Sequence, residues 1–192
     1  MTATKQPDDT IAFLKHLRQS RRFLDKPVPQ EIVAKLLEVA RWTGSAKNSQ
    51  PWEFVVVDDR ATNTSLSEAG QFTQFLDNVA VSIVIILDGA SPRSEAYDEG
   101  RVSERLMLAA DHLGLGSGTA WFSTPDAQAR VRQLLGIPAD RHIWSAVGFG
   151  YADPSAPQRA TSVGGGRKPL DEIVSYGRYG ERGKSRAASS TI

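Results

Sequence analysis

Apolar residues recur along the chain at helical spacing in some stretches and form unbroken runs in others. Ile32, Leu36 and Ala40 lie four residues apart, so they share one face of a predicted core-facing helix that begins at Pro29. The run Val81–Leu87 is apolar on both faces, which predicts a central buried strand. The same patterns predict helices around 11–17, 72–76, 102–113 and 131–135, strands over 54–58, 119–122 and 143–149, and a short helix or strand over 169–176.

Proline, glycine and short polar residues mark the predicted boundaries. Asp9 or Thr10 is expected to cap the first helix, and Gly114 and Gly136 are expected to stop two later ones. Residues 58–70 are polar and are expected to loop into a helix through Thr64 or Ser65. The stretch 88–98 is expected to be a loop and the best place in the chain for a mobile lid.

The length and composition favour one domain. A chain of 192 residues with 40% hydrophobic content can bury one substantial core. We expect an N-terminal tail over 1–8, one domain over 9–181 with an irregular stretch at 153–168, and a disordered C-terminal tail over 182–192.

Charge and residue usage exclude several classes of protein. The formal net charge of +1 provides no global field for nucleic acid or membrane surfaces. The chain has no cysteine, which excludes disulfides and thiolate sites. Its three histidines are too far apart in sequence to predict a metal site, and we expect them at the surface or at helix ends. The N-terminus does not resemble a secretory signal, and no apolar run could span a bilayer, so a cytoplasmic protein is expected.

A basic cluster follows the first predicted helix. Arg18, Arg21 and Arg22 would share one face if the helix continued through them. Solvent, a carboxylate or the negative end of the helix dipole would each satisfy this face. A phosphate would do so too, because guanidinium groups bind phosphate well.

The stretch Gly44–Trp52 lies between a core helix and an apolar strand. It is rich in hydroxyl and amide side chains, which donate and accept hydrogen bonds. Loops held between rigid elements often carry binding residues. An ordinary connecting loop with capping residues explains the same composition.

Familiar catalytic motifs are missing or misplaced. The glycines of 114–118 close a predicted helix and open a strand, whereas dinucleotide-binding glycines follow a strand and open a helix. No Gly-x-Ser-x-Gly elbow is present. Trp42 and Trp144 are expected in the core.

Four stretches in order resemble the FMN-dependent nitroreductase family. They are Leu17–Pro29, Ala40–Val57, Leu113–Ser117 and Arg167–Val174. The resemblance covers about Ile11 to Tyr179 and implies an α+β fold, with a central mixed sheet of about four strands surrounded by helices. It also implies a two-fold homodimer whose active sites are shared between the chains.

The resemblance implies which residues bind FMN. Residues of the first basic cluster would hold the flavin phosphate and ribityl chain, and the loop would reach the flavin of the partner subunit. A strand would line the ring by its backbone, and the C-terminal stretch would close over the phosphate. The residues of the basic cluster are Arg18, Gln19 and Arg21, and those of the loop are Ser45 and Asn48. The strand residues are Thr119, Ala120 and Trp121, and the C-terminal residues are Arg167 and Lys168.

The chain departs from the family pattern at four positions. Leu17 and Gln19 stand where an arginine and a serine are usual, so one guanidinium and one hydroxyl are absent. Gly44 replaces the usual proline before Ser45, and Lys47 adds a charge that could meet a nicotinamide phosphate or an acidic substrate.

The implied activity is transfer of reducing equivalents from NADH or NADPH through FMN to a nitroaromatic, a quinone or a similar electron-poor molecule. The flavin carries this chemistry, so no catalytic side chain is expected. Two alternatives are a specialised flavin oxidase or dehydrogenase on the same fold and a flavin-binding protein with little turnover. Nucleic-acid binding through the arginines is a third, but stacking aromatic residues are absent beside them.

Overall fold

Strand β2 (Val81–Leu87) lies inside a four-stranded sheet and is buried at all seven positions. The sheet has the order β1-β2-β4-β3, where β1 is Trp52–Val57, β3 is Gly116–Trp121 and β4 is His142–Gly150. All three strand pairs are antiparallel, so the expected mixture of parallel and antiparallel pairs is not found among the described strands. The α+β fold with a central sheet is confirmed, and the predicted burial of β2 is confirmed with it.

The computed structural model describes residues 7–156 and 167–182. The chain divides into two compact units, Met1–Pro154 and Ser155–Ile192. The sheet and its helices belong to the first unit, and helix α6 (Leu170–Ile173) belongs to the second. Most of the predicted tails and most of the irregular stretch at 153–168 lie outside the described residues, although the first helix already begins at Pro7. The predicted single domain over 9–181 stays a prediction.

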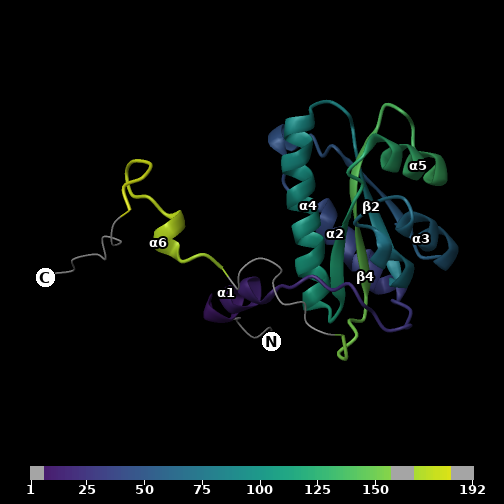
Figure 1. Ribbon diagram of the computed structural model, residues 1–192, viewed down its shortest axis with the longest axis horizontal. Helices are drawn as coiled ribbons and strands as arrows, with labels where there is room; N and C mark the ends of the chain where they lie inside the picture. Colours follow the sequence, from purple (N-terminus) through teal and green to yellow (C-terminus); the bar gives the residue numbers. More distant parts are fainter. Residues whose placement is uncertain (1–6, 157–166, 183–192) are drawn as a thin grey trace, which may run out of the picture. The chain divides into compact units, whose positions relative to one another are not determined.

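Two helices cover one face of the sheet. Helices α2 (Gln30–Arg41) and α4 (Pro92–His112) lie side by side along the strands (Figure 1). Leu36 of α2 and Leu106 of α4 are fully buried and pack in one cluster with Ile83 of β2. The helical stripe predicted from Ile32, Leu36 and Ala40 therefore does face the core, with Ile32 at its half-buried margin.

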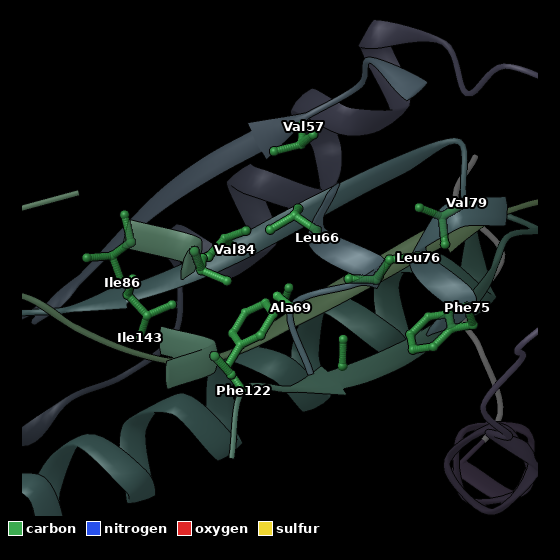
Figure 2. Packing of buried hydrophobic residues seen from close by; sticks show 14 of the residues in the cluster. Val57, Leu66, Ala69, Phe75, Leu76, Val79, Val84, Ile86, Phe122 and Ile143 are labelled. Carbon is green, nitrogen blue, oxygen red and sulfur yellow. The ribbon is translucent and has the colours of Figure 1, made fainter. Parts of the chain in front are cut away.

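The other face is covered by shorter elements. They are α3 (Arg60–Ser67), α5 (Pro125–Leu135) and the 3₁₀ turn η2 (Gln74–Asn78). Figure 2 shows Phe122 and Ile143 packed with Leu66 in this second core cluster. Burial of such large side chains contributes about 1.5–3 kcal/mol each, so both faces stabilise the sheet.

Several predicted boundaries are confirmed and others are wrong. Gly114 and Gly136 follow α4 and α5 with positive φ angles of 78° and 66°, as expected of helix stops. Helix α1 (Pro7–His16) begins before its predicted cap. Helix α3 begins at Arg60 because the Asp59 carboxylate accepts a hydrogen bond from the Thr62 N–H at 2.8 Å.

The predicted loop over 88–98 is confirmed for residues 88–91 and wrong from Pro92 onward, and the mobile lid expected there stays a prediction. Helix α4 begins at Pro92. Proline is well suited to the first turn of a helix, so a proline in this stretch does not indicate a loop after it. The predicted core position of Trp42 is wrong, since its side chain is 68% exposed. Trp144, also expected in the core, is partly buried against it. His16 and His112 end helices as expected, but His142 begins β4 and is partly buried.

Glycines allow the N-terminal segment to lie directly against β3, an edge strand of the sheet. A Cβ atom on Gly118 would lie 2.5 Å from the Ser20 carbonyl oxygen, and one on Gly116 would lie 2.8 Å from the Ser20 hydroxyl. No side chain fits at either distance. The sequence of β3 therefore determines how closely this segment approaches it.

We predict opposite effects for two glycine substitutions. Gly118→Ala forces Ser20 away from β3 and lowers the free energy of unfolding by about 1–3 kcal/mol. Gly100→Ala in helix α4 meets no atom within 4 Å and raises it by about 0.5–1 kcal/mol, because alanine favours helix. Urea unfolding measures both. A Gly118→Ala variant as stable as the parent chain would contradict the close approach.

Candidate functional site

Two side chains and one backbone N–H form a hydrogen-bonded network with the edge of β3. The Ser20 N–H donates to the Ser117 carbonyl at 2.7 Å. Arg21 donates from Nη1 to the Thr119 carbonyl at 2.6 Å and from Nη2 to Oε1 of Gln19 at 2.9 Å. The same Gln19 oxygen accepts from the Thr119 N–H at 3.3 Å. Four predicted site residues lie around this network: Arg18, Gln19, Arg21 and Thr119.

The predicted arginine face is not formed. Helix α1 ends at His16, and residues 17–20 have no helical structure. Arg18 stops the helix itself, because its Nη1 donates to the carbonyl oxygens of the three preceding residues at 2.8–3.2 Å. Arg21 points to β3, with its guanidinium carbon 4.3 Å from the centre of the Phe75 ring. A non-helical segment therefore carries the two arginines, and of the two only Arg21 has a described hydrogen bond to β3.

The predicted ring-lining residues differ in what they expose. Thr119 faces the edge with its N–H and C=O, and its hydroxyl lies 3.6 Å from the Met107 sulfur. Trp121 is 43% exposed. Ala120 is fully buried, and alternation along an antiparallel ladder turns its backbone groups toward β4. Contacts with a ligand at this edge therefore fall to Thr119 and Trp121.

The donors left at this edge fit a phosphate. Gln19 uses its oxygen within the network, so its NH₂ group points elsewhere and donates to no described residue. Arg18 uses only Nη1 in its described bonds, which leaves Nη2 and Nε. Gln19 therefore offers an amide beside this edge, and the preceding residue Arg18 offers a guanidinium; donors of this kind bind phosphate oxygens.

The loop after α2 has an unusual backbone. Lys47, Asn48 and Gln50 have positive φ angles of 54°, 56° and 47°, a region that costs residues other than glycine some stability. Ser45 stabilises the turn η1 (Ala46–Asn48), because its Oγ accepts the Gln50 N–H at 2.8 Å. Strain of this kind concentrates at ligand sites, which supports a role for Ser45 and Asn48.

This loop borders a cavity on α4. The cavity has a volume of about 430 Å³ and is lined by Ser45, Ala46, Arg93, Ser94, Tyr97, Asp98 and Arg101. A second cavity of about 440 Å³ is lined by Ser65, Ala69, Arg130, Gln133 and Leu134. The second contains none of the predicted site residues, so the first is the better candidate.

The two halves of the predicted site lie at different levels of α4. Thr119 lies at the level of Met107, and the loop lies beside residues 93–101. At about 1.5 Å per residue, the axial separation is about 9 Å or more. Arg167 and Lys168 are exposed in the second unit, which is described only by itself. The structure therefore brings together the β3-edge residues but not the complete predicted set.

Two buried carboxylates, absent from the sequence prediction, join α4 to β4. Glu95 is 1% exposed, and its Oε2 lies 2.7 Å from Nδ1 of His142, while its Oε1 has no hydrogen-bond partner among the described residues. Glu99 is 3% exposed and accepts a hydrogen bond from the Ser145 hydroxyl at 2.6 Å. Burial raises the pKa of the Glu99 carboxyl to about 7, and the charge of Glu95 adds to the rise.

The sequence carried a signal for these carboxylates. Glu95 and Glu99 lie four residues apart and continue, toward the N-terminus, the stripe that Val102 and Leu106 form on the core side of α4. The assignment of 88–98 to a loop concealed that continuation. No group of three or more potential ligands is placed to hold a metal ion within residues 7–156 and 167–182.

The sequence and the fold match those of a known family. The family model described as nitroreductase matches residues 15–151, most of the chain. The chain belongs to the nitroreductase family. It is thus an oxidoreductase of that family, and the resemblance seen in the sequence is confirmed.

Proteins with different names are similar to this chain in sequence or in structure. A protein of Archaeoglobus fulgidus, provisionally named NADH dehydrogenase/NAD(P)H nitroreductase, is 35% identical over 154 residues, covering 75% of this chain and 86% of that protein. The 5,6-dimethylbenzimidazole synthase of Rhodospirillum rubrum is 29% identical over 174 residues, covering 74% and 80%. The structure of an FMN-dependent nitroreductase from Clostridium difficile R20291 has a TM-score of 0.77 at 27% identity and covers 88% of this chain and 99% of its own.

Among the described helices, none combines the length and apolar character that a membrane crossing requires.

We predict that Glu99 makes stability depend on pH. Its pKa rises from 4.5 to about 7 on folding, so its stabilising contribution is complete below pH 4.5 and is lost as the pH rises through about 7. At about 1.4 kcal/mol per pKa unit, the loss reaches up to about 3 kcal/mol. Glu99→Gln keeps an acceptor for Ser145 and removes this loss.

The free energy of unfolding, measured from pH 5 to 8, tests this. Glu99→Gln should become more stable than the parent chain as the pH rises. Glu104→Gln, an exposed carboxylate on the same helix, is the control and should follow the parent chain. If Glu99→Gln also follows the parent chain across this range, the buried carboxylate does not titrate as described.

Proposed function

We propose that this nitroreductase is an FMN-dependent enzyme that passes reducing equivalents from NADH or NADPH to an electron-poor small molecule, such as a nitroaromatic or a quinone. Family membership supports the reaction class. The observation that carries the cofactor assignment is the β3-edge network, in which Arg21 and Thr119 hold Gln19 by its side-chain oxygen, so that its NH₂ group donates to no described residue.

The protein's part in this reaction is to bind and orient. When bound, FMN supplies the hydride and single-electron chemistry. Arg18 and Gln19 would hold the phosphate and ribityl chain, and Arg21 keeps Gln19 in place. Thr119 and Trp121 would border the ring, with Ala120 between them in the strand, and Arg167 and Lys168 would close over the phosphate.

We further propose a homodimer in which each flavin meets two chains. In one chain Ser45 and Asn48 lie about 9 Å or more along α4 from the level of Thr119. The loop would therefore complete the site of the partner subunit. A two-fold contact makes both sites at once, because each chain gives and receives the same surface.

A specialised flavin enzyme is the second candidate. The relative from Rhodospirillum rubrum named 5,6-dimethylbenzimidazole synthase favours it, while the relative from Archaeoglobus fulgidus favours the general reductase. A flavin-binding protein with little turnover is distinguished from both by its response to a reductant.

Spectroscopy of the purified protein tests the proposed reaction. We expect a yellow protein that NADH or NADPH bleaches without oxygen and that a quinone such as menadione turns yellow again. Yellow protein that neither nucleotide bleaches would contradict the reductase and support a binding protein or another reductant. Colourless protein that takes up no FMN would contradict all flavin functions.

Mixed dimers test the shared site. One chain carries Arg18→Ala with Gln19→Ala, and the other carries Asn48→Gly, which suits the positive φ angle at that position. Each parent dimer should bind FMN roughly tenfold to a hundredfold more weakly, the effect of losing a charge-assisted hydrogen bond. A mixed dimer, isolated with two affinity tags, should recover one intact site. If folded mixed dimers bind no better than their parents, the two halves do not come from different chains.

A further inference from the structure

The cavity between α4 and the Ser45 loop has an excess of positive charge. Arg93 and Arg101 line it with one carboxylate, Asp98. Arg101 is paired, since its Nη1 lies 3.5 Å from Oδ1 of the buried Asp98. Arg93 is exposed and has no hydrogen-bond or ion-pair partner among the described residues. One guanidinium of this cavity therefore remains available to an anion.

Gly44 lies against the end of the Arg101 side chain. A Cβ atom on Gly44 would lie 2.9 Å from Nη2 of Arg101, closer than a side chain normally approaches. The family pattern has proline at this position, and a proline ring would meet the same guanidinium. A residue with a Cβ atom at position 44 would therefore require the guanidinium of Arg101 to shift.

Lys47 adds a third positive group to the same region. It follows Ser45 and Ala46, which line the cavity, and it is exposed in the strained turn η1. Ser45, Ser94 and Tyr97 contribute hydroxyl groups to the lining. Positive charge together with hydroxyl donors suits the oxygens of a carboxylate or phosphate.

We infer that this cavity binds the anionic group of a small molecule that reacts at the proposed flavin site. The inference rests on the proposed function for the identity of that reaction. A carboxylate of an acidic electron acceptor and a phosphate of the nicotinamide nucleotide have the required chemistry. Guanidinium groups bind carboxylates and phosphates in the same way. The experiment below therefore distinguishes a carboxylate of the acceptor from a phosphate of the nucleotide.

Calorimetric titration of the purified dimer tests the anion site without turnover. The probes are 4-nitrobenzoate and its neutral analogue 4-nitrobenzyl alcohol, followed by NADPH and NADH. The variants are Arg93→Gln, which removes the unpaired charge, and Gly44→Ala, which displaces Arg101 without changing charge. Arg130→Gln is the control, because Arg130 is an exposed arginine in the other cavity. Flavin content is measured separately on each sample.

We expect Arg93→Gln to weaken the binding of either 4-nitrobenzoate or NADPH about threefold to tenfold at low salt. The binding of the matching analogue, 4-nitrobenzyl alcohol or NADH, should stay unchanged. Gly44→Ala should change the same probe in the same direction. Loss confined to 4-nitrobenzoate identifies an acidic acceptor, and loss confined to NADPH identifies the nucleotide phosphate. Equal effects on both members of each pair, or an equal loss in Arg130→Gln, would overturn the anion site. A colourless sample that still discriminates between the benzoate and the alcohol would instead count against the flavin function alone.

Discussion

The close approach of residues 19–23 to strand β3 is the constraint on which the site depends. β3 is an edge strand, and an open edge would expose unpaired backbone groups. Gly116 and Gly118 leave room for Ser20, whose N–H reaches the Ser117 carbonyl at 2.7 Å. Phe23 extends the contact by pairing with Ala152 beyond β4. The edge is thereby covered, and Gln19 and Arg21 are held beside Thr119.

Local patterns predicted the elements better than the contacts between them. The stripes of α2 and the run of β2 are visible in the sequence because burial repeats at the period of each element. The end of α1 is not visible in this way. Residues 17–23 leave the helix because they pair with strands about a hundred residues later, and periodicity contains no information about such partners. The helical geometry predicted for Arg18 and Arg21 was therefore wrong, and their shared role in binding stays a prediction.

Helix α4 serves different purposes along its length. Its C-terminal half packs on the sheet through residues such as Leu106. In its N-terminal half, Glu95 and Glu99 replace apolar residues on the core side, and the arginines and Tyr97 line the cavity on another side. Buried carboxylates are costly unless paired or protonated. The pairing with His142 and Ser145 explains how this half of the helix can remain on the sheet.

The Ser45 loop and Thr119 lie at different levels of α4. From this separation we infer that a flavin is held between two chains. The most direct test is sedimentation of the purified protein with protein absorbance and flavin absorbance recorded simultaneously. The flavin boundary should move with a two-chain species that carries two flavins, and dilution that dissociates the dimer should release the flavin. A single chain that sediments with bound flavin would contradict the claim.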